Sequence, residues 1–221
     1  MDKLIGKFLG KLDDDLFITT RGVAYQYDMK TVKYNGEYFD KYKNYKGSKI
    51  ANKLNECRVT LVSNFTKDPI LDIGIGSGEF IENCEDSFGY DINPKAIEWL
   101  KDRELFRDDF ESFNAFTMWD VIEHIETPED YFSKMSGHLF CSLPIFEDLD
   151  KIRDSKHYRP DEHLYYFTEK GFISWMSLHG FRCKAVTNME TKAGREDILS
   201  FVFYKDLPTY YENSFYSKWM Q

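Results

Sequence analysis

Two groups of residues in this sequence have types and spacings that could do chemistry. Glycines stand at positions 74, 76 and 78, where a backbone without Cβ atoms can turn sharply and come close to a ligand. Further along the chain, Glu123 and His124 are neighbours, and a histidine can accept a proton near neutral pH. The sequence therefore predicts a ligand-binding turn and, separately, a candidate proton acceptor.

The spacing of the glycines narrows the kind of ligand. A dinucleotide fingerprint, G-x-G-x-x-G, would place its third glycine where this chain has Glu79. A phosphate loop of the Walker type would end in Gly-Lys followed by Ser or Thr, which this turn lacks. A glycine-rich turn that binds nothing stays open on the turn alone, so the choice depends on residues downstream.

Short elements must hold the turn in place. Pro69 cannot donate to a ladder, so it begins the segment, and the mostly apolar run 70–73 is typical of a strand buried on both faces. We expect a short helix over 79–84, after the turn. A second strand then ends at Asp91, 17 positions after Gly74, near the ~20 at which a carboxylate accepts hydrogen bonds from a ribose.

Strand and helix patterns continue to alternate through the rest of the chain. They predict an α/β fold with a seven-stranded, mainly parallel sheet and flanking helices over 69–205, followed by a C-terminal tail over 206–221. The carboxyl ends of parallel strands share one edge of a sheet, where open α/β folds bind ligands. The remaining strands are expected at 105–110 (a strand and its loop), 114–119, 139–144, 181–187 and 198–204, the last two as an antiparallel pair.

Residues 1–68 precede this sheet. Tyrosines and aliphatic residues between 37 and 65 suggest two helices broken at Gly47-Ser48, so we predict a helical N-terminal cap over 1–68. Lysines and aromatic residues interleave over 41–49, which could contact nucleic-acid phosphates and bases. A solvated helix face is the favoured interpretation, because the stretch has no arginine and no nucleic-acid module motif.

Composition restricts the partners. A net charge of -9 and a pI near 5.1 disfavour nucleic acid, which attracts basic surfaces. The four cysteines form no C-x-x-C pair, so we expect reduced thiols. The first residues have too little apolar content for a signal peptide, and no run reaches the ~18 apolar residues of a membrane span. We therefore expect a cytoplasmic protein with no membrane association.

The order of these features resembles a known family. The run Leu71-Asp72-Ile73-Gly74-Ile75-Gly76-Ser77-Gly78 resembles the first motif of class I S-adenosylmethionine (SAM)-dependent methyltransferases, and the resemblance covers residues 69–204. It implies a Rossmann-like fold and SAM as cofactor. Three further segments are similar to the ubiquinone-type small-molecule O-methyltransferase branch: 120–125, 162–168 and 178–181.

The resemblance also implies which residues bind SAM. The backbone at Gly74, Gly76 and Gly78 would pass close to the amino-acid part, and Asp72 would face its ammonium group directly or through water. Asp91 would accept hydrogen bonds from the ribose. The other implied cofactor residues are Ile92 on the adenine, Asp109 and Phe110 at the adenine edge, and Trp119 and Asp120 at the exit of the fourth strand.

Glu123 and His124 are the implied catalytic residues, because methylation of a hydroxyl or amine requires loss of the acceptor's proton. In relatives of the ubiquinone type an acidic-x-x-Glu-His run can hold a divalent cation, and Asp120, Glu123 and His124 match that run. Adjacent residues do not share a helix face, so no metal is assigned and the match stays a hypothesis. Alternatively, Glu123 begins a helix before Pro128, and His124 only closes the SAM pocket.

An insertion over 145–166 is expected to be the acceptor lid. Its candidate substrate-binding residues are His157, Tyr158, Arg159 and His163. The predicted function is SAM-dependent O- or N-methylation of a small-molecule acceptor. Methylation of a nucleotide or nucleic acid, and a SAM-binding partner protein without transferase activity, are the alternatives.

Overall fold

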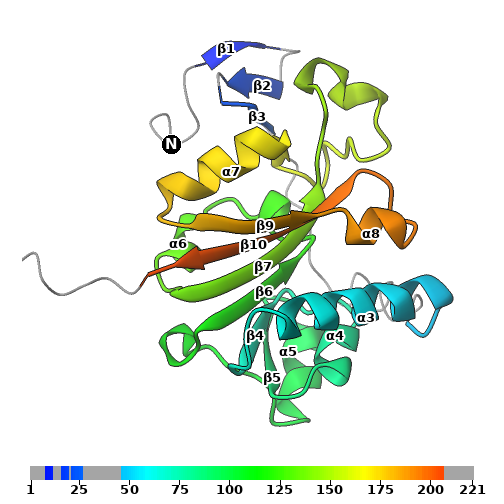
Figure 1. Ribbon diagram of the computed structural model, residues 1–221, viewed down its shortest axis with the longest axis vertical. Coiled ribbons are helices and arrows are strands. Elements are labelled where there is room, and N and C mark those ends of the chain that lie inside the picture. The colour runs from blue at the N-terminus through cyan, green and yellow to red at the C-terminus, as the bar shows by residue number, and fades with distance from the viewer. Residues whose placement is uncertain (1–7, 12–15, 20, 27–45, 207–221) are drawn as a thin grey trace, which may run out of the picture.

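The computed structural model describes residues 8–11, 16–19, 21–26 and 46–206 and contains two sheets, one above the other in Figure 1. The larger sheet has six strands in the order β5-β4-β6-β7-β10-β9. The smaller sheet has four strands in the order β1-β2-β3-β8. The α/β fold predicted from the sequence is confirmed.

The larger sheet is mostly parallel. Its first four strands in spatial order run parallel to one another, whereas β10 is antiparallel to both β7 and β9, as predicted for the last pair. The carboxyl ends of the four parallel strands therefore lie at one edge. The strands are β4 (Ile70–Ile73), β5 (Ser87–Tyr90), β6 (Ala115–Trp119), β7 (Gly137–Pro144), β9 (Arg182–Thr187) and β10 (Ile198–Lys205).

Helices cover both faces of this sheet. Successive side chains of a strand point to opposite faces, so Phe116 and Met118 of β6 lie in a core with α6 and α7, while Ala115 and Trp119 lie in another with α3 and α4. None of the helices that the structure describes is long and apolar enough to cross a membrane. The helices are α3 (Lys49–Ser63), α4 (Glu79–Asn83), α5 (Pro94–Lys101), α6 (Glu129–Phe132), α7 (Glu169–Leu178) and α8 (Met189–Lys192).

The prediction of seven strands is wrong, because the segment 105–110 does not form a strand. It contributes a single bridge to the edge of the sheet: the Gly89 N–H donates to the Leu105 carbonyl and the Arg107 N–H donates to the Gly89 carbonyl. Beyond this bridge Asp108 and Asp109 are exposed, and a 3₁₀ turn, η1 (Phe110–Ser112), begins at once. Too few apolar residues follow one another here to sustain a strand.

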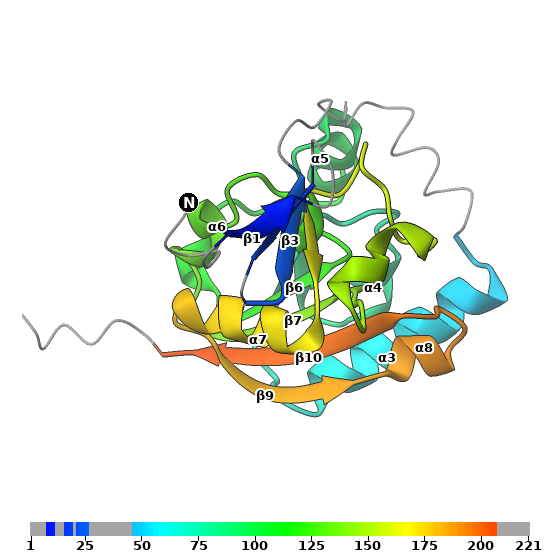
Figure 2. The same ribbon diagram turned by 90° about the horizontal axis from the view of Figure 1, so that it is seen from above.

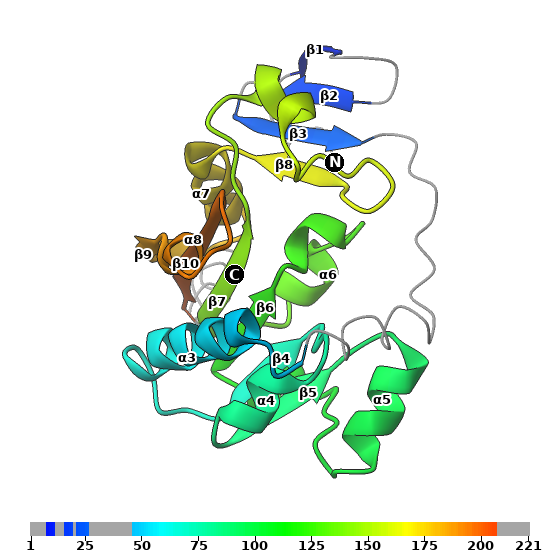
Figure 3. The same ribbon diagram turned by 90° about the vertical axis from the view of Figure 1, so that its right-hand side faces the viewer.

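The helical N-terminal cap is also wrong at residues 8–11, 16–19 and 23–26, which are strands of the smaller sheet (Figure 3). The fourth strand is β8, from the predicted insertion, and it pairs with β3. These strands are β1 (Phe8–Lys11), β2 (Leu16–Thr19), β3 (Val23–Gln26) and β8 (Tyr165–Phe167). Of the two predicted helices, the second is confirmed as α3, and the first lies outside the described residues.

The insertion has an apolar core of its own. Phe146, Leu149 and Ile152 pack with Tyr166 and with residues of β2 and β3 around the 3₁₀ segment η3 (Leu149–Asp154). The small sheet is also fastened to α7, because both the N–H and the hydroxyl of Thr168 donate to the Gly22 carbonyl. The segment predicted as a lid is therefore packed against N-terminal strands. Of the tail predicted over 206–221, residues 207–221 lie outside the described residues.

Candidate functional site

The glycine turn leaves β4 with three residues in the left-handed region. Gly74, Gly76 and Gly78 have φ of +75°, +54° and +78°, which other residues adopt only at a cost. A Cβ on Gly74 would lie 2.7 Å from the Val121 side chain, and one on Gly78 would lie 2.6 Å from the Trp99 ring. A Cβ on Gly76 would meet nothing within 4 Å. Gly76 is thus the position at which the backbone faces open space.

Asp91 ties the end of β5 to this turn. Its Oδ2 accepts a hydrogen bond from the Ile75 N–H at 3.0 Å, and its Oδ1 accepts one from the Asn93 N–H at 2.8 Å. Burial raises the pKa of Asp91, against these hydrogen bonds, which lower it. Ile92, the next residue, is 56% exposed although it is aliphatic. A carboxylate and an uncovered apolar side chain therefore stand beside the glycine turn.

Asp91 and Ile92 line a pocket of about 700 Å³, within the range of small-molecule sites. Phe110, which the resemblance implies at the adenine edge, lines this pocket too. Of the neighbouring acidic pair, Asp108 lines the pocket, whereas Asp109, the implied residue, does not. The far wall comes from residues around α6, which sequence reasoning did not find. The lining residues are Tyr90, Asp91, Ile92, Ile97, Phe106, Asp108, Phe110, Thr127, Asp130, Tyr131 and Lys134.

Asp72 lies inside the sheet and does not line this pocket. It is 1% exposed, and its Oδ1 accepts a hydrogen bond from the Thr117 hydroxyl of the neighbouring strand β6. Burial raises the pKa of Asp72 to about 7, although Thr117 acts in the opposite direction. In this position Asp72 links two strands behind the turn.

Asp120, directly after β6, is bound by two arginines that sequence reasoning did not find. Arg195 donates to both of its oxygens, at 2.7 and 2.9 Å, and Arg58 of α3 lies 3.3 Å from Oδ2. The same two guanidinium groups bind Glu190 of α8, which is fully buried. Burial acts to raise the pKa of Asp120, but the arginines prevail and hold it at about 2.

This set, Arg58, Asp120, Glu190 and Arg195, joins three separate segments, and we name it the arginine-carboxylate network. Helices α3 and α8 come together near β10 (Figure 2), which brings Arg58 to Glu190 across 132 positions of sequence. No local pattern signals such a meeting. Arg58 also lies over the ring of Trp119, 4.9 Å from its centroid, and Trp119 is buried against Phe80.

Glu123, His124 and His163 form a second cluster, which we name the Glu-His-His cluster. The first two lie in the 3₁₀ turn η2 (Ile122–His124), and His163 comes from the insertion. Their potential ligand atoms all lie within 4.8 Å of one another. The Leu164 N–H donates to the Glu123 carbonyl at 2.8 Å and so fixes the insertion to η2. The structure therefore joins one predicted substrate-binding residue to both predicted catalytic residues.

Burial governs the charges in the Glu-His-His cluster. Glu123 is 2% exposed, and none of the other residues that the structure describes donates a hydrogen bond to its carboxylate oxygens. Burial, with repulsion from Asp120, raises the pKa of Glu123 well above its usual value. Burial likewise lowers the pKa of His124. Burial, together with electrostatic repulsion from His124, lowers the pKa of His163 to about 3. Both imidazoles are therefore neutral near pH 7.

The other predicted substrate-binding residues do not join this cluster. The His157 Nε2 lies 2.8 Å from the Glu196 carbonyl, on the outer side of the insertion. Arg159 forms an exposed ion pair with Glu162. The Tyr158 ring packs on Tyr166 at 5.6 Å between centroids, within the core of the insertion.

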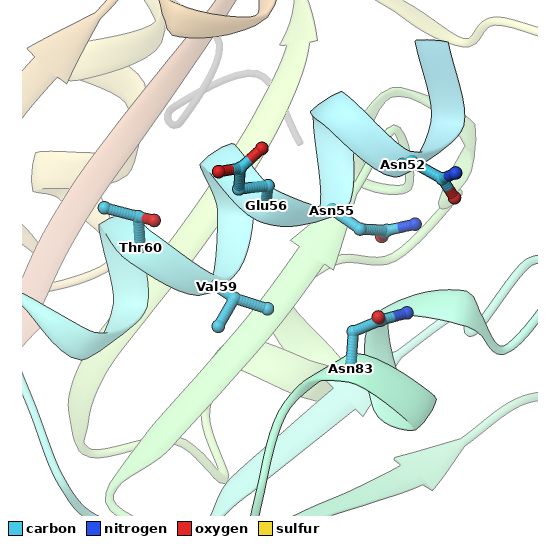
Figure 4. Close-up of a pocket in the computed structure, with 6 residues that line it drawn as sticks. All are labelled: Asn52, Asn55, Glu56, Val59, Thr60 and Asn83. Carbon is cyan, nitrogen blue, oxygen red and sulfur yellow. The ribbon is translucent and has the colours of Figure 1, made fainter. Parts of the chain in front are cut away.

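A smaller pocket of about 290 Å³ lies between α3 and α4 (Figure 4). Asn83 lines it and is the last residue of α4, so the pocket lies at the end of that helix away from the glycine turn. The other lining residues are Asn52, Asn55, Glu56, Val59 and Thr60, all on α3.

Residues 42–186 match a family model described as a methyltransferase domain. The chain belongs to this family. The methyltransferase has the class I fold, and its cofactor is SAM. These findings confirm the class of enzyme and the cofactor that the resemblance implied, whereas membership of the ubiquinone-type branch stays a prediction.

Solved structures share the fold of the methyltransferase at low sequence identity. A SAM-dependent methyltransferase of Thermotoga maritima is 14% identical, with a TM-score of 0.58, covering 77% of this chain and 97% of that one. The magnesium protoporphyrin IX methyltransferase of Synechocystis with bound S-adenosylhomocysteine is 14% identical (TM-score 0.55, 78% and 96%). The 1,6-didemethyltoxoflavin N1-methyltransferase of Burkholderia thailandensis is 12% identical (TM-score 0.51, 90% and 99%). A search of curated proteins finds no match.

Proposed function

We propose that the methyltransferase methylates an oxygen or nitrogen of a small-molecule acceptor that binds beside the Glu-His-His cluster. The observation that carries this proposal is the gathering of a buried carboxyl group and two neutral imidazoles, two of them directly after β6 and the third from the insertion. Val121, two residues before Glu123, packs against Gly74. The cluster thus begins beside Gly74, the first glycine of the turn, so that acceptor chemistry and SAM can meet at one edge of the sheet.

The described residues fit SAM. The open space at Gly76 admits the amino-acid part close to the backbone. Asp91 keeps lone pairs beyond the two that Ile75 and Asn93 use, so it can also accept hydrogen bonds from ribose hydroxyls. Ile92 and Phe110 offer apolar surface to the adenine, and Asp108 is the carboxylate at the pocket edge that can accept from its amino group.

In this proposal Asp72 and Asp120 support the site rather than contact the cofactor. Asp72 is held by Thr117, and both oxygens of Asp120 are occupied by arginines. Asp120 has a φ of +56°, an unfavourable conformation for a residue with a side chain, so its ion pairs help to hold the turn into η2. Trp119 closes the face of β6 against α3 and α4.

Bound SAM supplies an electrophilic methyl group, and the residues of the chain must orient the acceptor and manage its proton. The His124 Nδ1 lies 2.7 Å from the Glu162 carbonyl, which can only accept, so the proton of the neutral ring is on Nδ1. The lone pair on Nε2 is then available to the acceptor side. An acceptor O–H or N–H beside it can donate its proton to Nε2, which is unprotonated because burial lowers the pKa of His124.

Three relatives in fold support a small acceptor. Their names describe methylation of magnesium protoporphyrin IX, of 1,6-didemethyltoxoflavin and of a glycopeptide. Of the lysine-rich stretch that would favour nucleic acid, residues 41–45 lie outside the described residues, and Lys46 is paired with Glu82. The negative net charge also argues against a polyanion.

The test is transfer of label from methyl-tritiated SAM into a cell extract that is then separated into metabolites, RNA, DNA and protein. We expect label in the metabolite fraction with the wild-type protein and at least ~100-fold less with His124→Ala, because general-base catalysis typically contributes 10²–10⁴-fold. Label confined to RNA or DNA would contradict a small-molecule acceptor. SAM binding without label in any fraction would favour a partner protein without transferase activity.

A further inference from the structure

We propose that the acceptor is a primary amine whose ammonium group binds to Glu123, His124 and His163, so that the reaction is N-methylation. This inference rests on the proposed function and narrows its acceptor to one chemical class. Three observations carry it: the spacing of the three groups, the buried charge of Glu123 and the tautomer of His124.

The Glu-His-His cluster has the dimensions of an ammonium site. A carboxylate oxygen and one nitrogen from each imidazole lie within 4.8 Å of one another. An ammonium nitrogen has three N–H donors at tetrahedral angles, and acceptors about 2.9 Å from it along these directions lie about 4.7 Å apart. The spacing of the cluster therefore lets one nitrogen donate to all three groups at ordinary hydrogen-bond lengths.

The charge of Glu123 distinguishes an amine from a hydroxyl. Its carboxylate is 2% exposed and, within the part of the chain that the structure describes, accepts no hydrogen bond from another residue. Burying a carboxylate without a partner is strongly unfavourable, and burial raises the pKa of Glu123 accordingly. A hydroxyl brings one donor and no charge, whereas an ammonium group brings three donors and a positive charge. An ammonium group therefore compensates the buried carboxylate.

The acceptor must supply this charge, because the nearby guanidinium groups are bound elsewhere. Arg58 and Arg195 both pair with Asp120 and Glu190, so two positive charges meet two negative ones and the arginine-carboxylate network is neutral as a whole. It leaves Glu123 without a counter-charge. The net charge of -9 also favours the approach of a cation over that of an anion.

The two imidazoles serve as neutral acceptors, and one of them is placed to take a proton. The His163 ring lies edge-on to that of His124, 4.7 Å away between centroids, and its pKa of about 3 keeps it neutral beside a cation. In His124 the Nδ1 proton faces the Glu162 carbonyl at 2.7 Å, so Nε2 carries the lone pair. The same carbonyl stabilises the imidazolium that forms when Nε2 accepts a proton, and so acts to raise the pKa of His124 against burial.

The transfer balances with these groups and SAM. The bound ammonium group gives one proton to the His124 Nε2, and the free amine keeps two N–H groups for Glu123 and His163. The amine is then no longer held by His124, and its nitrogen lone pair attacks the methyl carbon of SAM. An N–C bond forms, the S–C bond breaks, and its electron pair stays on the sulfur of S-adenosylhomocysteine. The product is an N-methylammonium ion, and the proton on His124 passes to solvent.

The experiment blocks the amines of the acceptor pool before methyl-tritiated SAM and the full-length protein are added. The metabolite fraction of a cell extract is acetylated with N-acetoxysuccinimide and then treated with hydroxylamine, which cleaves acetyl esters and leaves acetamides intact. We expect label in the untreated fraction, none in the acetylated one, and label again when the two fractions are mixed. Undiminished label in the acetylated fraction would overturn the amine acceptor, whereas absence of label in the untreated fraction refutes the proposed function itself.

The labelled product gives a second readout on the wild-type protein alone. Hydriodic acid releases O-methyl groups as methyl iodide under conditions that leave N-methyl groups bound. We expect the label to stay in the involatile residue. Release of the label as methyl iodide would overturn N-methylation and leave methyl transfer to a small molecule standing.

Glu123→Gln keeps the shape of the side chain and removes its charge. We expect the amount of metabolite fraction that gives half-maximal labelling to rise at least ~100-fold, because loss of one partner from a buried ion pair has a cost of that order. The Kd for SAM, measured by calorimetry, should stay at the wild-type value and shows that the variant is folded. His138→Gln is the control, since His138 packs against Phe140 and Tyr204 instead. Wild-type half-saturation in folded Glu123→Gln would overturn the cluster as the ammonium site.

Discussion

Gly76→Ala should weaken SAM binding without unfolding the protein. Gly76 has a φ of +54° and open space around the position of a Cβ, so alanine would meet no neighbour within 4 Å. The left-handed conformation destabilises the folded state of an L-residue by roughly 1–2 kcal/mol. Alanine also lowers the conformational entropy of the unfolded chain, which offsets about 0.4–1 kcal/mol of that cost. We therefore expect the free energy of unfolding to fall by only about 1 kcal/mol.

The cost for binding should be larger. A ligand that contacts the backbone at Gly76 would meet the new methyl group, and overpacking by a methyl group typically costs about 1–3 kcal/mol. That range corresponds to a Kd for SAM roughly 5- to 150-fold weaker. Calorimetric titration with SAM measures this Kd directly, and urea unfolding of the same samples measures stability.

Gly47→Ala is the matched control. Gly47 has a φ of +76°, and its Cβ would also meet nothing within 4 Å, so alanine should cost about the same in stability, roughly 1 kcal/mol. The Gly47 N–H donates a hydrogen bond to the Glu79 carboxylate, and a methyl group at position 47 would leave this backbone donor in place. We expect its SAM affinity to equal that of the wild type. If Gly76→Ala also binds SAM with wild-type affinity, the cofactor does not approach the turn there and the reasoning fails.

Three further changes probe separate parts of the site. Asp91→Ala should weaken SAM binding about 100-fold in calorimetry, because two charge-assisted hydrogen bonds of about 1.5 kcal/mol each are lost; equal affinity would remove Asp91 from the site. Arg195→Met leaves the buried Glu190 with one guanidinium partner and should lower the unfolding free energy by about 3 kcal/mol, whereas a change within about 0.5 kcal/mol would show that the arginine-carboxylate network adds little. Burial raises the pKa of Asp72 from 3.8 to about 7, so folded protein keeps a proton that the unfolded chain releases. As the pH rises from about 4 to 7, the unfolding free energy should therefore fall more steeply in the wild type than in Asp72→Asn. An equal dependence of the unfolding free energy on pH in the two proteins would contradict the raised pKa of Asp72.

Much of the larger sheet could be predicted from the sequence because its signals are local. A buried strand, a turn of glycines and a carboxylate 17 positions later all lie within one strand-helix-strand unit. The segment 105–110 fails as a strand because only Leu105 and Phe106 are apolar before two acidic residues. The smaller sheet could not be foreseen, since β3 pairs with β8 across about 140 positions of sequence.

The same holds for the site: residues with a local sequence signal could be predicted, whereas residues that depend on contacts with distant segments could not. Gly76 and Asp91 are found by spacing, whereas the contacts of Asp120 depend on Arg58 and Arg195, which lie far from it in sequence. His163 was predicted in the insertion without its neighbours. Only the pairing of the insertion with η2, through the Leu164 N–H, brings it to the predicted catalytic pair.

The most direct test of the account measures turnover and SAM binding together in His124→Ala, once labelled SAM has identified the acceptor. Management of the acceptor's proton typically contributes 10²–10⁴-fold to such reactions, so turnover should fall at least ~100-fold. Because Gly76 and Asp91 are unchanged, the Kd for SAM should stay at the wild-type value. An unaltered rate of methyl transfer would contradict the assignment of chemistry to the Glu-His-His cluster.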